Sequence, residues 1–110
     1  MANPKVSTVG GGNPLVVSEW KVDGNGVLAS GSAYVKGSVL GKNTDGNFEL
    51  TTDATKAEAI LLDDVDATAG LKNAPILIGG AVDKEQLVLG GSLTLTDVEA
   101  NLRDKNIYLK

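Results

Sequence analysis

The chain has 110 residues, the length of one compact domain, and 42% of them are hydrophobic against 22% charged, which is a globular composition. It contains neither cysteine nor histidine, which excludes disulfides, thiolate metal sites, histidine-ligated zinc and catalysis that relies on a histidine base. The formal net charge of -4 has the wrong sign for neutralising phosphates, so we expect no nucleic-acid partner.

The N-terminal part of the sequence changes character twice. Residues 1–14 are rich in glycine, asparagine and proline, a composition that predicts a flexible arm. Residues 15–22 alternate as in an extended strand, and the Asp-Gly-Asn-Gly sequence at 23–26 predicts a tight turn after it. We therefore expect an N-terminal arm over residues 1–22 and a β-rich domain over residues 23–110. The other interpretation makes residues 15–22 the first strand of the domain.

Short apolar runs separated by turn residues continue through the middle of the chain. A hairpin is expected within residues 32–50, around Asn43-Thr44-Asp45-Gly46, and a turn of helix within residues 54–59. The pair Gly79-Gly80 indicates a bulge or a close backbone approach. The further expected strands are 60–62, 75–82, 86–89 and 107–109.

One stretch has the pattern of a helix. Thr96 and Glu99 have the spacing of a capping box, and Val98 and Leu102 lie four residues apart on one face. The helix is expected near residues 97–104, with Asn106 ending it. The predicted fold is therefore mostly β, a small compact β-tulip or barrel-like domain with one short C-terminal helix and the flexible N-terminal arm.

Motifs that carry chemistry are missing from the sequence. The Gly41-Lys42 pair lacks the spacing and the following serine or threonine of a phosphate loop, and the aspartate-containing turns lack the ligand spacing of a calcium-binding loop. The clustered acids Asp63, Asp64 and Asp66 have no neighbour that indicates a catalytic pocket. We expect no enzymatic activity, no cofactor and no metal. No apolar run exceeds residues 59–62, so we expect no membrane association.

Three segments in order resemble a known family. They are residues 34–41 (YVKGSVLG), 57–66 (AEAILLDDVD) and 102–109 (LRDKNIYL). They are similar to the small head decoration, or cement, proteins of tailed bacteriophages, the family that includes the decoration protein of phage lambda. The resemblance implies a homotrimer that binds the major capsid protein on the outer surface of the expanded head and stabilises it. It also implies a place in the virion after synthesis in the host cytoplasm.

The arm is the expected binding element, since an extended segment can add to an exposed sheet edge of a partner. Its candidate capsid-binding residues are Leu15, Val16, Val17 and Trp20. Trp20 fits an interface anchor as well as a core position. An alternative function is a β-rich carbohydrate-binding or adhesin module, which would depend on the four aromatic residues Trp20, Tyr34, Phe48 and Tyr108.

Overall fold

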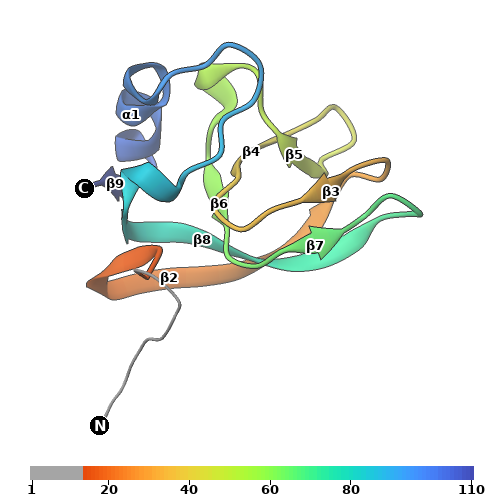
Figure 1. The fold of residues 1–110 in the computed structure, drawn as a ribbon, viewed down its shortest axis with the longest axis horizontal. Coiled ribbons are helices and arrows are strands. Elements are labelled where there is room, and N and C mark those ends of the chain that lie inside the picture. The colour runs from red at the N-terminus through yellow and green to blue at the C-terminus, as the bar shows by residue number, and fades with distance from the viewer. Residues whose placement is uncertain (1–13) are drawn as a thin grey trace, which may run out of the picture.

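The computed structural model describes residues 14–110, so residues 1–13 of the arm expected over residues 1–22 lie outside the described residues. Strands dominate this part of the chain, and one short α-helix lies near its C-terminal end (Figure 1). In chain order the elements are β2 (Val16–Leu28), β3 (Ala33–Tyr34), β4 (Val39–Lys42), β5 (Phe48–Leu50), the 3₁₀ turn η2 (Ala54–Lys56), β6 (Ala59–Leu61), β7 (Val65–Asp66), β8 (Lys72–Val82), the 3₁₀ turn η3 (Lys84–Gln86), α1 (Leu95–Asp104) and β9 (Ile107–Leu109).

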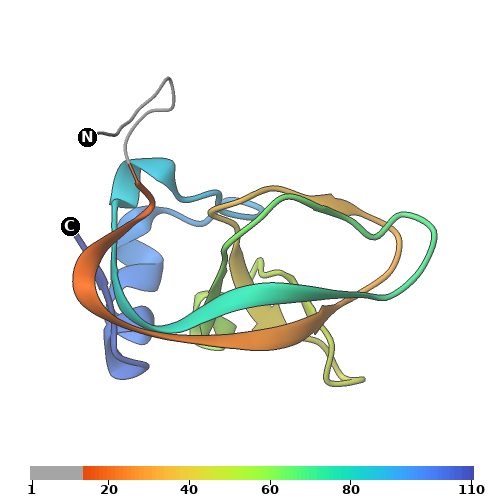
Figure 2. The same ribbon diagram turned by 90° about the horizontal axis from the view of Figure 1, so that it is seen from below.

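The main sheet has six strands in the order β2-β5-β4-β6-β8-β9, and β2 also pairs with β8. Figures 1 and 2 show β2 and β8 running side by side as the longest ribbons, joined by an antiparallel ladder. The neighbours from β2 round to β8 form a ring, but β2 and β5 meet through one residue pair, Leu28 and Phe48. The predicted mostly β fold is confirmed, with a sheet that is barrel-like and incompletely closed. A separate two-stranded ribbon is formed by β3 and β7.

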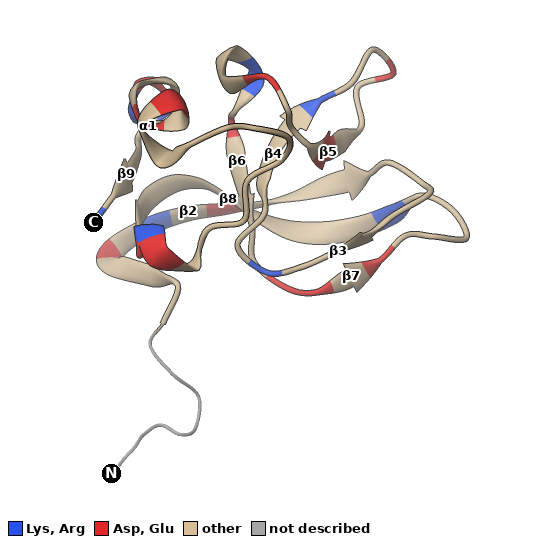
Figure 3. Ribbon diagram, turned by 45° about the horizontal axis from the view of Figure 1, so that its top comes forward, with Lys and Arg blue, Asp and Glu red and all other residues tan. Residues whose placement is uncertain are grey.

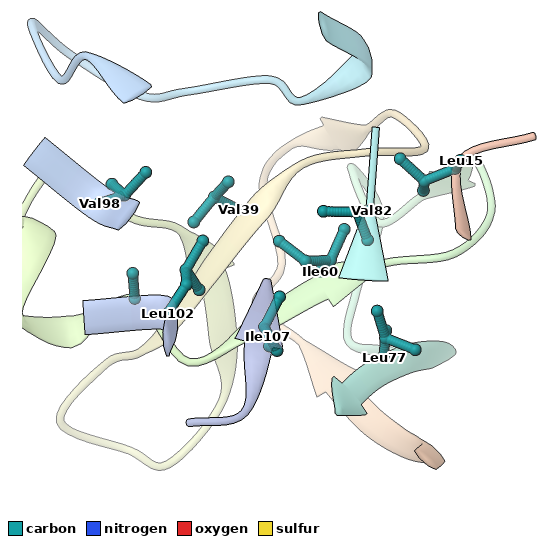
Figure 4. Packing of buried hydrophobic residues seen from close by; sticks show 9 residues of the cluster. Leu15, Val39, Ile60, Leu77, Val82, Val98, Leu102 and Ile107 are labelled. Atoms are coloured by element: carbon teal, nitrogen blue, oxygen red, sulfur yellow. The ribbon is translucent and has the colours of Figure 1, made fainter. Parts of the chain in front are cut away.

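The central strands are buried on both faces. In β6, Ile60 belongs to one core cluster while its neighbours Ala59 and Leu61 belong to a second, and Leu77 and Ile76 of β8 divide in the same way. Successive side chains of a strand point to opposite faces, so each of these strands lies between two apolar layers. The first layer, shown in Figure 4, gathers residues from α1, β4, β6, β8, β9 and the approach to β2. Two-sided burial explains the continuous apolar run at residues 59–62.

The turn expected at residues 23–26 is wrong, because β2 continues through it to Leu28. Each of these residues pairs with β8, and neither Gly24 nor Gly26 has a positive φ. A side chain at Gly26 would meet the ring of Phe48, since a Cβ there would lie 2.6 Å from Phe48 Cδ2. The glycine makes room for close packing and forms no turn. The expected arm boundary at residue 22 thus falls inside one continuous strand.

The helix is confirmed, but its capping box lies two residues earlier than expected. Thr94 is the N-cap, the Asp97 N–H donates to Thr94 Oγ1, and the Thr94 N–H donates to a carboxylate oxygen of Asp97 at 2.8 Å. Leu93 before the cap and Val98 in the first turn pack on the same core cluster, which is a hydrophobic staple. The N-cap is thus Thr94, and the cap expected at Thr96 is wrong. Asn106 follows the helix at a φ of 66°, a left-handed conformation that ends it as expected.

Several smaller expectations are confirmed. The hairpin joins β4 to β5 through Asn43-Thr44-Asp45-Gly46, where Gly46 has a φ of 84° and the Asn43 side chain accepts from Asp45 N–H and Asn47 N–H. Strands occur at 59–61, 72–82 and 107–109, and Gly80 has a φ of 137°.

The strand expected at 86–89 is wrong. Asp83 caps the 3₁₀ turn η3 over Lys84–Gln86, because its carboxylate accepts a hydrogen bond from the Glu85 N–H. In the stretch that follows, only Val88 forms a bridge, to Ser38, while Leu87 and Leu89 pack against the core. The cap turns the backbone before a strand can form.

The two glycines of β2 give a matched test of this packing. We expect Gly26→Ala to lower the free energy of unfolding by about 1 to 3 kcal/mol, since the new methyl group collides with the Phe48 ring. Gly24→Ala is the control, because the nearest atom to a Cβ there is Ile78 Cδ1 at 3.6 Å, an ordinary contact. Urea unfolding of the three proteins measures the difference. Equal stability of both variants would contradict the packing role of Gly26.

Candidate functional site

The described residues offer little material for catalysis. They hold no group of three or more acidic side chains that could bind a metal ion. Asp63 and Asp66 accept local hydrogen bonds, from the Asp64 N–H and from the Thr68 N–H and hydroxyl, while Asp64 accepts from the N–H of the distant Lys36. These three aspartates therefore stabilise loops.

No helix in this part of the chain is long and apolar enough to span a membrane.

A pocket of about 430 Å³ with a mixed polar and apolar lining lies beside β3. Its walls include Tyr34, Ser38 and Glu49, and the Tyr34 hydroxyl donates to the carbonyl of Ala29 at 2.9 Å. Burial, with a smaller effect of the Glu49 charge, raises the pKa of Tyr34 above its usual 10.0. The hydroxyl therefore stays protonated near neutral pH and acts as a structural donor.

The structure separates the four predicted capsid-binding residues into two pairs. Leu15 is buried in the first core layer, and Val16 is half-buried against the same layer. Val17 is 46% exposed and Trp20 is 50% exposed. Of the two interpretations of Trp20, its exposure fits the interface anchor rather than a core position. Leu15 and Val16 instead fix the start of β2 to the domain.

The entry of the chain into the domain is held by polar contacts as well. The Asp83 N–H donates to the Leu15 carbonyl at 2.8 Å, and the Gln86 side-chain amide donates to the Pro14 carbonyl and to the Asp83 carboxylate. These bonds join Pro14 and Leu15 to η3. The start of the described chain is thus fixed in position on the domain.

Trp20 is presented by a large bulge in β2. Val16 pairs with Val82 and Lys21 pairs with Gly80, so four residues, 17–20, stand opposite Ala81 alone. Ser18 takes the place of a backbone partner there, since its Oγ accepts from the Ala81 N–H at 2.9 Å and donates to the Trp20 carbonyl. A bulge bends its strand and redirects side chains. Here Val17 and Trp20 point to solvent.

The bulge completes an exposed apolar surface, which we call the Trp20 face: Val17, Trp20, Val22, Ile78 and Tyr108. The rings of Trp20 and Tyr108 meet edge to face, with centroids 6.3 Å apart. A Cβ placed on Gly79 would lie 3.5 Å from Trp20 Cζ3 and 3.4 Å from Val22 Cγ2, so the missing side chain leaves the face continuous. A groove of about 530 Å³ runs between Val17, Ser18, Trp20, Ala81, Tyr108 and Lys110.

Sequence reasoning missed the part of this face that β8 and β9 provide. The signal for Tyr108 was present, because it alternates with Ile107 and Leu109, which face the core. What brings Tyr108 to Trp20 is the parallel pairing of β9 with β8.

Figure 3 shows Lys and Arg mixed with Asp and Glu over the ribbon. The ion pair of Lys21 with Asp23 beside the face, at 3.2 Å, is exposed and contributes little to stability.

Comparison with known proteins adds one match. The model of the family described as bacteriophage lambda head decoration protein D matches residues 16–106. The matched region contains the α-helix and every strand of the described structure except β9, which begins one residue after it. A comparison with curated protein sequences found no match.

The role of Ser18 is open to a direct test. We expect Ser18→Ala to loosen the bulge and lower the free energy of unfolding by about 0.5 to 1.5 kcal/mol, since the Ala81 N–H loses its acceptor. Trp20 is the single tryptophan of the chain, so its fluorescence and acrylamide quenching report on the bulge alone. Ser92→Ala, at an exposed serine in the loop before α1, is the control. Identical quenching in both variants would contradict the role of Ser18.

A second prediction concerns the stability of the domain at low pH. The hydrogen bond from the Gln86 side chain, aided by that from the Glu85 N–H, lowers the pKa of Asp83 below its usual 3.8. Asp53 and Asp66 are shifted the same way, chiefly by the hydroxyls of Thr55 and Thr68. A lowered folded pKa contributes stability that is present at neutral pH and lost as the pH falls through that pKa. We expect melting temperature to fall below about pH 4, and less steeply in Asp83→Asn.

Proposed function

The chain belongs to the family of the bacteriophage lambda head decoration protein D, a family of structural head proteins, and from this we propose that it binds the outer surface of the expanded phage head as a trimer and stabilises the shell. The observation that carries the proposal is the family match across residues 16–106. The partners are the major capsid protein and two further copies of the chain, with neither nucleic acid nor membrane. The protein is made in the host cytoplasm and resides in the virion.

The binding element in this proposal is the N-terminal region over residues 1–22. Its first part, residues 1–13, precedes Pro14, whose carbonyl accepts a hydrogen bond from the side chain of Gln86 in η3. Its last part lies in β2, where Val17 and Trp20 are exposed. An extended segment can pair with a sheet edge of a capsid subunit and so join neighbouring subunits. A ligand that binds only the assembled shell stabilises that shell by mass action.

Three copies acting together make weak contacts sufficient. Ordering an extended segment costs about 1 to 2 kcal/mol per residue of fixed backbone, which lowers the affinity of one arm. Once one arm of a trimer has bound, the others bind at a high effective concentration, and avidity can exceed single-site affinity by roughly 100 to 10,000 fold. The subunit contacts of the trimer lie outside the arm.

The alternative, a carbohydrate-binding module, has less support. Tyr34 and Phe48 are buried, and the exposed rings of Trp20 and Tyr108 meet at an interplanar angle of 70°. Sugar sites in such modules depend on exposed aromatic platforms. Family membership favours the decoration function over this alternative.

The proposal predicts selective binding to mature shells. We expect the full chain to sediment with expanded capsids and not with unexpanded ones, and to raise the temperature at which expanded capsids break. A variant lacking residues 2–13 should keep its melting temperature, since every contact described above remains, but should protect capsids poorly. Removing residues 2–20 would also delete Leu15, and we expect this variant to lose about 2 to 5 kcal/mol or more of folding stability.

The deletion of residues 2–13, capsid binding by the full chain and the trimer are each tested by a separate result. Far-ultraviolet circular dichroism before mixing confirms that the shorter deletion is folded. Full protection by the variant lacking residues 2–13 would remove that segment from the binding element. Absence of sedimentation of the full chain with expanded capsids would overturn the decoration function itself, and single copies at two-fold positions would contradict the trimer.

A further inference from the structure

We propose that the Trp20 face is a capsid contact separate from residues 1–13, and that its groove receives an apolar side chain from the major capsid protein. This inference rests on the proposed function. It assigns part of the folded domain, formed by β2, β8 and β9, to the partner that the family implies. The sequence placed Trp20 in an arm, whereas the structure presents it on a rigid sheet together with Ile78 and Tyr108.

The apolar exposure of the described surface is concentrated on this face. Seven large hydrophobic side chains of the described residues are exposed, and five of them form the Trp20 face. In Figure 1, β2 and β8 lie along one side of the molecule, and no other described element lies beyond them. An apolar patch of this kind costs free energy in water, and such patches mark interaction sites. The domain leaves this side of the sheet for a partner to cover.

The groove has the form of an acceptor. It is an open depression lined by the rings of Trp20 and Tyr108, the Val17 side chain and Lys110. Aromatic side chains in such pockets carry a large part of the energy of protein interfaces. Ser18 and the four-residue bulge hold Trp20 in place before binding, which reduces the entropy lost on association.

A second copy of the chain is a poorer occupant than the capsid protein. In a cyclic trimer each interface joins two different faces of the subunit, so the Trp20 face would need another apolar face to meet. The other exposed large hydrophobics of the described residues are Val35, after β3, and Leu71, before β8. These two residues do not belong to the Trp20 face and provide no comparable apolar surface. The described surface therefore offers no apolar complement to this face.

Position on the chain favours the capsid as well. Val17 follows Pro14 by three residues, so the face begins close in sequence to residues 1–13. Hydrogen bonds from Gln86 and Asp83 fix Pro14 and Leu15 in position. If residues 1–13 bind a capsid subunit, the same subunit or its neighbour lies against the face. Residues 1–13 and the Trp20 face then bind the partner as two linked sites, which makes the binding bivalent.

The test uses Trp20→Ala and Val17→Ser in the full chain, with Leu71→Ala as a control at a side chain that is 56% exposed outside the face. We expect each face variant to keep its melting temperature within a few degrees and to keep the oligomeric state of the wild type in sedimentation velocity. Each should bind expanded capsids at least about tenfold more weakly than the wild type, since truncating an interface anchor commonly has an effect of this size. Leu71→Ala should bind as the wild type does.

The outcomes separate the possible occupants. Unchanged capsid binding by both face variants would overturn the inference while leaving the proposed function intact. Dissociation of a wild-type trimer by Trp20→Ala and not by Leu71→Ala would overturn it too, and would make the face a contact between copies. If Trp20→Ala fails to fold, Val17→Ser alone decides between these results. Failure of the wild type itself to bind expanded capsids would overturn the proposed function, and this inference with it.

Discussion

The antiparallel pairing of β2 with β8 is the constraint on which the rest of the structure depends. These are the longest strands, with 13 and 11 residues, and their ladder runs from Val16 opposite Val82 to Leu28 opposite Lys72. Its N-terminal end brings Leu15 into the first core layer, and its C-terminal end places Leu28 in the second. One ladder thus links both layers and fixes where the N-terminal segment enters the domain.

The same ladder allows a large irregularity in β2. A sheet that depended on a short pairing could not accommodate four unpaired residues, but the long ladder continues on the far side of the bulge from Lys21 onward. Ser18 satisfies the Ala81 N–H that the bulge leaves without a ladder partner. The cost of the interruption is therefore reduced at the place where the apolar side chains of Val17 and Trp20 leave the core side and point outward.

Anchoring and exposure together suit a protein of a structural head family. Pro14 and Leu15 are tied to η3 and to the core, so tension on the N-terminal segment would be transmitted to the folded domain. The sheet surface next to this anchor is apolar, and it carries the chain's single tryptophan.

The sequence by itself determined the local elements: the hairpin at Asn43–Gly46, the helical face of Val98 and Leu102, the strand at 107–109 and the family. The elements follow from turn chemistry and periodicity over a few residues, and the family follows from the resemblance of three short segments. Tertiary structure alone decided the rest. Gly24 and Gly26 have the local signature of a turn, yet the ladder to β8 and the ring of Phe48 hold them in a strand. Likewise, Tyr108 meets Trp20 only because β8 pairs with both β2 and β9. Pairing between strands distant in sequence depends on which apolar layers close together, and no local pattern contains that information.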